Sequence, residues 1–148
     1  MTDAAQLPWR RICCAIDLSP ASRAALTHAI SVARASRAEL ILVHARARTG
    51  GGTLFAPPAR KRASEEAGDA LARWTAYARE TVPVTTSVEP SGSPAEAIVR
   101  VVEDFSCDLI VIATHGRSSV FRAALGSVAE NVLRLAPCPV LVVHASAV

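Results

Sequence analysis

The chain has 148 residues, of which 51% are hydrophobic and 4% aromatic, and its formal net charge is +3. This length suits one domain with its own core, and the composition excludes a largely disordered protein. No apolar run approaches the roughly 20 residues that span a bilayer, and the basic residues are dispersed apart from a cluster at Arg60, Lys61 and Arg62. We therefore expect neither a membrane protein nor a nucleic-acid-binding protein.

The N-terminal residues 1–10 are expected to form a tail. They lack the apolar core that follows a basic start in a secretion signal, so we expect a cytoplasmic protein. The cysteines at positions 13, 14, 107 and 138 show neither a C-x-x-C pair nor finger-like histidine spacing. We expect buried thiols rather than a zinc site or a disulfide framework.

Short apolar runs alternate with longer segments of helical periodicity through residues 11–148, which we take as one domain. Four of the five runs are nearly continuous in apolar residues, as in parallel strands that are covered on both faces. The run at 82–88 is more polar and contains Pro83, which suits an edge strand. The expected strands, in chain order, are 11–17, 39–45, 82–88, 108–113 and 139–144.

Four helical segments lie between these strands. Ser19 before Pro20 predicts a capped start for the first helix, and the second is expected to begin near Ser64. The sequences SPAE and SVAE offer capping boxes for the third and fourth helices, with Ser93 and Ser127 as the N-caps. This alternation predicts an α/β fold in which a single domain forms a doubly wound parallel sheet with helices on both faces.

One long loop interrupts the regular alternation. Residues 46–63 contain three glycines and two prolines, a composition typical of a flexible connection. The loop leaves the carboxyl end of a strand, the edge where such sheets bind ligands. It could cover a ligand or be a passive connector.

The stretch ATHGRSSVFRAALGSVAEN, residues 113–131, suggests an anion site after the fourth strand. Gly116 would let the backbone approach a ligand closely, and Ser127 at a helix start would present free N–H groups. If the first and fourth strands flank the point where the strand order reverses, Asp17 would face this stretch and could hold a ribose. Neither a Walker phosphate loop nor a strand followed by G-x-G-x-x-G is present.

Four segments, DLSPASRAALTHAISVA, ELILVHA, GSPAEAIV and CDLIVIATHGRSSVFRAALGSVAENVLRLAPCPVLVV, resemble the universal stress protein family from near Arg11 to His144. The resemblance implies a five-stranded sheet of order 3-2-1-4-5 and a homodimer in which the last strands, 139–144, of two chains pair. It also implies a choice, because some members bind ATP or a related adenine nucleotide, AMP and ADP included, with or without Mg²⁺, and others bind none.

The members that bind a nucleotide carry G-x-x-G-x9-G-[ST]. Gly116, the nine residues 117–125, and the pair Gly126 and Ser127 match this pattern, whereas Ala113 replaces the first glycine. Its methyl group could crowd the phosphates. The resemblance implies a ribose held by Asp17, an adenine lined by Ala15, Ala45 and Ile112, and phosphates bound around Ala113, Gly116, Gly126, Ser127 and the Val128 amide, with His115 near them. Independently of the resemblance, Arg117 could pair with phosphate charges.

Each of these residues also has a simpler interpretation. Asp17 could cap the following helix, although Ser19 fills that role better. His115 has no acidic partner nearby in the sequence, so loop-shaping hydrogen bonds are favoured over general-base catalysis. Arg117 could be a solvated surface residue, and Gly126 could merely end one helical turn.

The leading hypothesis is an ATP-binding universal stress protein that acts as a nucleotide-responsive stress-adaptation module. We expect slow hydrolysis at most, because no carboxylate pair to hold Mg²⁺ and no convincing base is evident; no catalytic residue or protein metal site is assigned. The alternative is a nucleotide-free dimeric adaptor, in which Ala113 closes the phosphate site and the surface recognises a protein. An adenylating enzyme would need substrate-activating residues that the sequence does not offer.

Overall fold

The computed structural model describes residues 9–47, 58–114 and 125–144. Strands and helices alternate strictly along them. The strands are β1 (Arg11–Ile16), β2 (Glu39–Ala47), β3 (Val84–Ser91), β4 (Leu109–Ala113) and β5 (Val140–Val143). The helices are α1 (Pro20–Ser36), α2 (Pro58–Arg79), α3 (Pro94–Asp104) and α4 (Ser127–Leu135). Every strand expected from the sequence is present.

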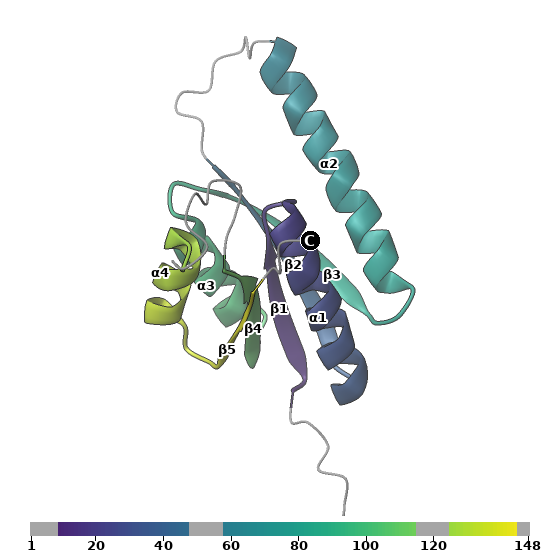
Figure 1. Cartoon of the computed structure of the whole chain (residues 1–148), viewed down its shortest axis with the longest axis vertical. Coiled ribbons are helices and arrows are strands. Elements are labelled where there is room, and N and C mark those ends of the chain that lie inside the picture. Colours follow the sequence, from purple (N-terminus) through teal and green to yellow (C-terminus); the bar gives the residue numbers. More distant parts are fainter. Residues whose placement is uncertain (1–8, 48–57, 115–124, 145–148) are drawn as a thin grey trace, which may run out of the picture.

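The five strands form one parallel sheet of order β3-β2-β1-β4-β5 (Figure 1). Every residue of β4 is buried, as its uninterrupted apolar run LIVIA requires. β3 lies at an edge, which confirms the placement inferred from its polar sequence and from Pro83. The doubly wound α/β fold and the strand order implied by the resemblance are both confirmed.

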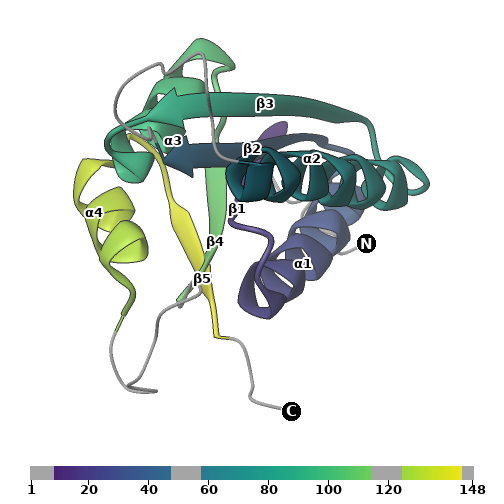
Figure 2. The ribbon, with the colours of Figure 1, turned by 90° about the horizontal axis from the view of Figure 1, so that it is seen from above.

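Different helices cover the two faces of the sheet (Figure 2). The α1/α2 face carries the core that includes residues of α1 and α2, and the α3/α4 face carries the core that includes residues of α3 and α4. Side chains of β1 alternate between them: Cys14 and Ile16 pack on the α1/α2 face, Cys13 and Ala15 on the α3/α4 face. The face on which a strand residue lies therefore decides which helices it meets.

Two helix starts follow the sequence prediction. The Ser19 hydroxyl accepts a hydrogen bond from the Ser22 N–H at 3.2 Å at the start of α1, and the Ser93 hydroxyl accepts one from the Glu96 N–H at 3.5 Å at the start of α3. A proline follows each cap and needs no hydrogen-bond partner for its nitrogen. Both predicted caps are confirmed.

The second helix begins earlier than expected. β2 continues to Ala47 and α2 already begins at Pro58, so both ends of the expected 46–63 loop belong to regular elements and the predicted start near Ser64 is wrong. Proline suits a first helical turn, and the Ala, Arg and Lys residues that follow are good helix formers. Ser64, the expected start, lies inside the helix.

Helix α2 is anchored to α1 by a stacked arginine. The guanidinium of Arg23 lies 4.5 Å from the ring centre of Tyr77 and 5.4 Å from that of Trp74. Leu71 and Ala78 bury the inner side of α2 in the core of the α1/α2 face. α2 has 22 residues, yet neither it nor any other described helix is apolar enough over such a length to cross a bilayer.

All four cysteines are free thiols; Cys13, Cys14 and Cys107 are buried, as expected, whereas Cys138 is only partly buried. Burial alone raises the pKa of Cys14, on the α1/α2 face, to about 12. On the other face, a hydrogen bond from the Cys13 thiol raises the pKa of Cys13 and lowers that of Cys107, because it stabilises the Cys107 thiolate. The thiols on the two faces of β1 therefore have raised pKa values for different reasons: burial alone for Cys14, and mainly the hydrogen bond to Cys107 for Cys13.

Candidate functional site

Strands β1 and β4 stop pairing before they end. β1 pairs with β4 only through Ile12, Cys13 and Cys14, whereas its pairing with β2 continues to Ile16. The strand order reverses between β1 and β4, because the chain builds β2 and β3 on one side of β1 before it reaches β4 on the other. We call the carboxyl ends of these two strands the switch point; open α/β sheets bind ligands at this place.

Small and apolar side chains lie on the α3/α4 face of the switch point. Ala15 of β1 and Ile112 of β4 both belong to the core of that face and are each 6% exposed. Ala45 follows Val43, a member of the same core, by two residues along β2, so it shares the face. The structure therefore brings together the three residues assigned to an adenine by the resemblance.

Asp17 lies in the tight turn between β1 and α1. Its Oδ1 accepts a hydrogen bond from the Ser19 N–H at 2.9 Å, and its own N–H donates to the Ser22 hydroxyl at 3.3 Å. Leu18 between them has a positive φ of 65°. The turn fixes the carboxylate beyond the end of β1, and its second oxygen, Oδ2, has no hydrogen bond within the described residues.

Ala113, the departure from the glycine pattern, ends β4 with its side chain on the opposite face. It belongs to the core of the α1/α2 face, is 9% exposed, and pairs in register with Val143 of β5. Its methyl group therefore points away from Ala15 and Ile112. The sequence could not reveal this direction, because it depends on the exact phase of the strand.

No described side chain caps the amino end of α4. The N-cap residue is Gly126, which has no side chain to accept a hydrogen bond from the first turn. The predicted capping box is therefore wrong: Ser127 is the first residue of the helix and is exposed. Val128 packs partly against the core of the α3/α4 face. The first N–H groups of α4 consequently keep their capacity to bind an anion.

Two residues without a predicted role shape the switch point. The backbone of Thr114 joins three elements: its N–H donates to the Val143 carbonyl, and its carbonyl accepts from the Gly126 N–H. The Nδ1 of His44 lies 3.1 Å from the Ile16 carbonyl oxygen, to which it donates. No sequence pattern indicates these contacts, because they join residues far apart in the chain.

Three of the predicted site residues, His115, Gly116 and Arg117, lie outside the described residues, as does most of the nine-residue spacer of the glycine pattern. The described part of the predicted site consists of the switch point with Asp17 and the amino end of α4. It joins a small apolar surface, a carboxylate and free amide groups. These are the chemical features that a nucleotide requires for its base, sugar and phosphates.

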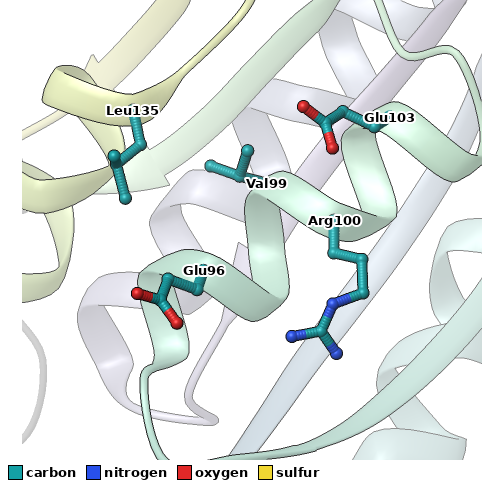
Figure 3. A pocket seen from close by; sticks show the side chains of 5 residues that line it. All are labelled: Glu96, Val99, Arg100, Glu103 and Leu135. Atoms are coloured by element: carbon teal, nitrogen blue, oxygen red, sulfur yellow. The ribbon is translucent and has the colours of Figure 1, made fainter.

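A separate hollow lies between α3 and α4, away from the switch point. Figure 3 shows that it is lined by Glu96, Val99, Arg100 and Glu103 of α3 and by Leu135 at the end of α4. Its volume is about 390 Å³, and none of the predicted site residues lines it. In the described part of the chain, no three histidine, cysteine or acidic side chains are grouped so that they could hold a metal ion.

Comparison with known proteins identifies the family that shares this architecture. The model of the universal stress protein family matches residues 8–144. A universal stress protein of Thermus aquaticus, encoded in the QAH/OAS sulfhydrylase 3' region, is 36% identical over 138 residues, which are 92% of this chain and 99% of the relative.

Solved structures agree with this match. Protein MJ0577 of Methanocaldococcus jannaschii superposes with a TM-score of 0.82 at 26% identity, over 96% of this chain and 100% of that one. A universal stress protein solved in complex with cAMP gives a TM-score of 0.71 at 25% identity, over 95% and 100%. The family match, the relative and the shared strand order lead to one conclusion: this chain belongs to the universal stress protein family.

Proposed function

We propose that this chain is a cytoplasmic universal stress protein that binds an adenine nucleotide, ATP foremost, at the switch point between β1 and β4. The observation that carries the proposal is the uncapped amino end of α4, joined to the end of β4 by the hydrogen bond from Gly126 to Thr114. This arrangement aims free N–H groups and the positive end of the helix dipole at the place where phosphates would lie. Complex formation with cAMP by a structural neighbour supports the choice of an adenine nucleotide.

The base and the sugar have suitable partners. Ala15 and Ala45 have short side chains, so an adenine ring could approach the strand backbone, with Ile112 packed beneath it. Asp17 would accept hydrogen bonds from ribose hydroxyl groups through Oδ2, while Oδ1 remains bonded to the turn. A carboxylate held in this way needs little reorganisation on binding.

The phosphates would bind at the start of α4. The amides of Ser127 and Val128 are the donors that the structure supports here. Gly116, His115 and Arg117 remain proposals from the glycine pattern, with Arg117 as a charge partner of phosphate oxygens. We assign no catalytic residue and expect slow ATP hydrolysis at most, so that nucleotide occupancy, with or without Mg²⁺, would serve as the signal in stress adaptation.

In the alternative hypothesis, the methyl group of Ala113 closes the phosphate site. Its methyl group lies in the core of the α1/α2 face, opposite Ala15 and Ile112. A group that is already buried in the core does not occupy the space beside the adenine residues. This position supports nucleotide binding in spite of the missing glycine.

We propose further that two chains pair through β5 and the residues beside it, 139–144. β5 is an edge strand that pairs with β4 on one side, and its Leu141 is 38% exposed. Apolar edge strands require cover, and a second copy of the strand would provide it.

A nucleotide-free adaptor remains the second candidate function. Exposed leucines on α4 and β5, namely Leu133, Leu135 and Leu141, support a protein-binding surface in either case. The two candidates differ in whether the switch point binds a nucleotide. Occupancy of the switch point therefore decides between them.

Thermal unfolding with a panel of nucleotides tests the proposal. Nucleotide-stripped protein is heated alone and with ATP, AMP, cAMP or GTP, and saturating ATP should add about 2.7 kcal/mol of stability at 100 times Kd. The variant Asp17→Asn keeps an oxygen for the Ser19 N–H but loses the charge, so its ATP response should be smaller. No response to any nucleotide would support the adaptor, whereas equal responses to ATP and GTP would contradict the choice of an adenine nucleotide.

A further inference from the structure

The buried hydroxyl of Thr114 has no hydrogen-bond partner within the part of the chain that the structure describes. Thr114 is 2% exposed, and its Oγ1 is one of two buried side-chain oxygens in the described residues that bond to nothing. Both backbone groups of Thr114 are satisfied, the N–H by Val143 and the carbonyl by Gly126. An unpaired buried polar group destabilises the folded state, and such groups are rare in native proteins. The stability of the folded chain therefore does not explain why a hydroxyl group is present at residue 114.

The hydroxyl lies on the side of the sheet where α4 begins. Along β4, Ile110 and Ile112 face the α3/α4 core, and Thr114 continues this alternation by one step beyond the strand. Its carbonyl contacts the N-cap residue of α4, Gly126. The unpaired O–H and the uncapped N–H groups of α4 therefore occupy one small region.

We propose that the Thr114 hydroxyl donates a hydrogen bond to an oxygen of a bound phosphoryl group at the amino end of α4. The inference deepens the nucleotide-binding function proposed above and rests on it. A phosphoryl group offers several strong acceptor oxygens. One hydroxyl and two backbone amides would give it three donors without a lysine, and Lys61 is the only lysine of the chain. Thr114 falls on a variable position of the glycine pattern, so the pattern itself assigns it no role.

The other unpaired buried hydroxyl among the described residues, that of Ser36, lies where no anion would bind. Ser36 is also buried, at 7% exposure, and its Oγ also bonds to nothing in the described residues. It is the last residue of α1, where carbonyl groups and the negative end of the dipole disfavour an anion. Ser36 is therefore a matched control: an unpaired hydroxyl without an anion site.

The test separates binding from folding through Thr114→Val, which keeps the branched shape and removes the O–H. Because the hydroxyl is unpaired without ligand, the melting temperature of the ligand-free variant should equal or exceed that of the wild type. Its Kd for ATP, measured by calorimetry, should rise about tenfold. Thr114→Ser restores the hydroxyl and should return Kd to within about threefold of the wild-type value. Ser36→Ala should leave Kd unchanged.

Two outcomes would overturn the assignment. An unchanged ATP Kd in Thr114→Val would remove the hydroxyl from the site while leaving nucleotide binding intact. A lower melting temperature in ligand-free Thr114→Val, without rescue of Kd by Thr114→Ser, would give the hydroxyl a structural role instead.

Inorganic triphosphate, titrated in parallel, separates this inference from the proposed function. If the wild type binds triphosphate but not ATP, the adenine proposal fails, and a weaker triphosphate affinity of Thr114→Val would still support the hydroxyl contact. If the wild type binds neither, both proposals fail.

Discussion

Ala113 illustrates how one residue can mislead when only its type is known. Alanine in place of the first glycine of the pattern suggests a methyl group against the phosphates, yet the methyl packs in the core of the α1/α2 face. Asp17 could be proposed from its place after the first strand, whereas Ala15 was proposed only because the family resemblance implies it. Thr114 could not be proposed from the sequence, because an unpaired hydroxyl becomes visible only when its surroundings are known.

Replacing Ala113 with glycine should change stability more than binding. The variant Ala113→Gly loses a buried methyl and gains backbone freedom, which should cost about 1 to 2 kcal/mol in urea unfolding. Its ATP Kd should stay within about threefold of the wild-type value. Ala15→Val, which adds methyl groups on the other face, should weaken ATP binding at least about tenfold. Markedly tighter binding by Ala113→Gly would show that the methyl does crowd the ligand.

Cys14 should make stability fall at alkaline pH. Burial raises the pKa of Cys14 in the folded chain to about 12 from 9.0. Below pH 9 the thiol is protonated in both the folded and the unfolded chain. Above pH 9 the unfolded chain loses this proton, whereas the folded chain keeps it. At pH 10.5 this costs about 2 kcal/mol of stability. When the pH rises from 8 to 10.5, the free energy of unfolding of Cys14→Ala, measured with urea, should fall by about 2 kcal/mol less than that of the wild type. Identical losses in both proteins would refute the assignment.

Helix starts show where local sequence is sufficient and where it is not. Ser19 and Ser93 were predicted correctly because a serine directly before a proline specifies a cap by itself. Ser127 was misassigned because serine also fits the first helical turn, and the cap position belongs to Gly126 with extended backbone, φ −62° and ψ 151°. The start of α2 at Pro58 was missed because no capping residue marks it.

The contact of Arg23 with two aromatic rings should stabilise the packing of α2 on α1. Arg23→Ala removes the cation from above Tyr77 and Trp74, which should lower the free energy of unfolding by about 0.5 to 1 kcal/mol. Arg34→Ala, on the same helix but over no ring in the described residues, provides the control. Equal losses for the two variants in urea unfolding would show that the stacking contributes nothing.

The α/β fold of this chain was predictable from its sequence, whereas the pairing of two chains is a proposal. The order of strands and helices follows from uninterrupted apolar runs such as that of β4, which can exist only between two covered faces. The order of the strands in the sheet came from the resemblance, because periodicity does not specify which strands are neighbours.

The edge strand β5 should mediate dimer formation. Leu141→Lys places a charge on the exposed side of β5 and should convert the protein to a monomer in sedimentation equilibrium, because edge lysines oppose strand pairing. Leu133→Lys changes a leucine of α4 with similar exposure, 44% against 38%, and should leave the dimer intact. If both variants stay dimeric, or the wild type is monomeric, pairing through β5 is contradicted.

The proposed function depends on ATP binding at the switch point, which calorimetric titration of nucleotide-stripped protein with ATP and Mg²⁺ measures. We expect saturable binding with a micromolar Kd, which corresponds to a binding free energy on the order of 8 kcal/mol. No heat of binding and no thermal stabilisation at millimolar ATP would contradict it and would favour the nucleotide-free adaptor.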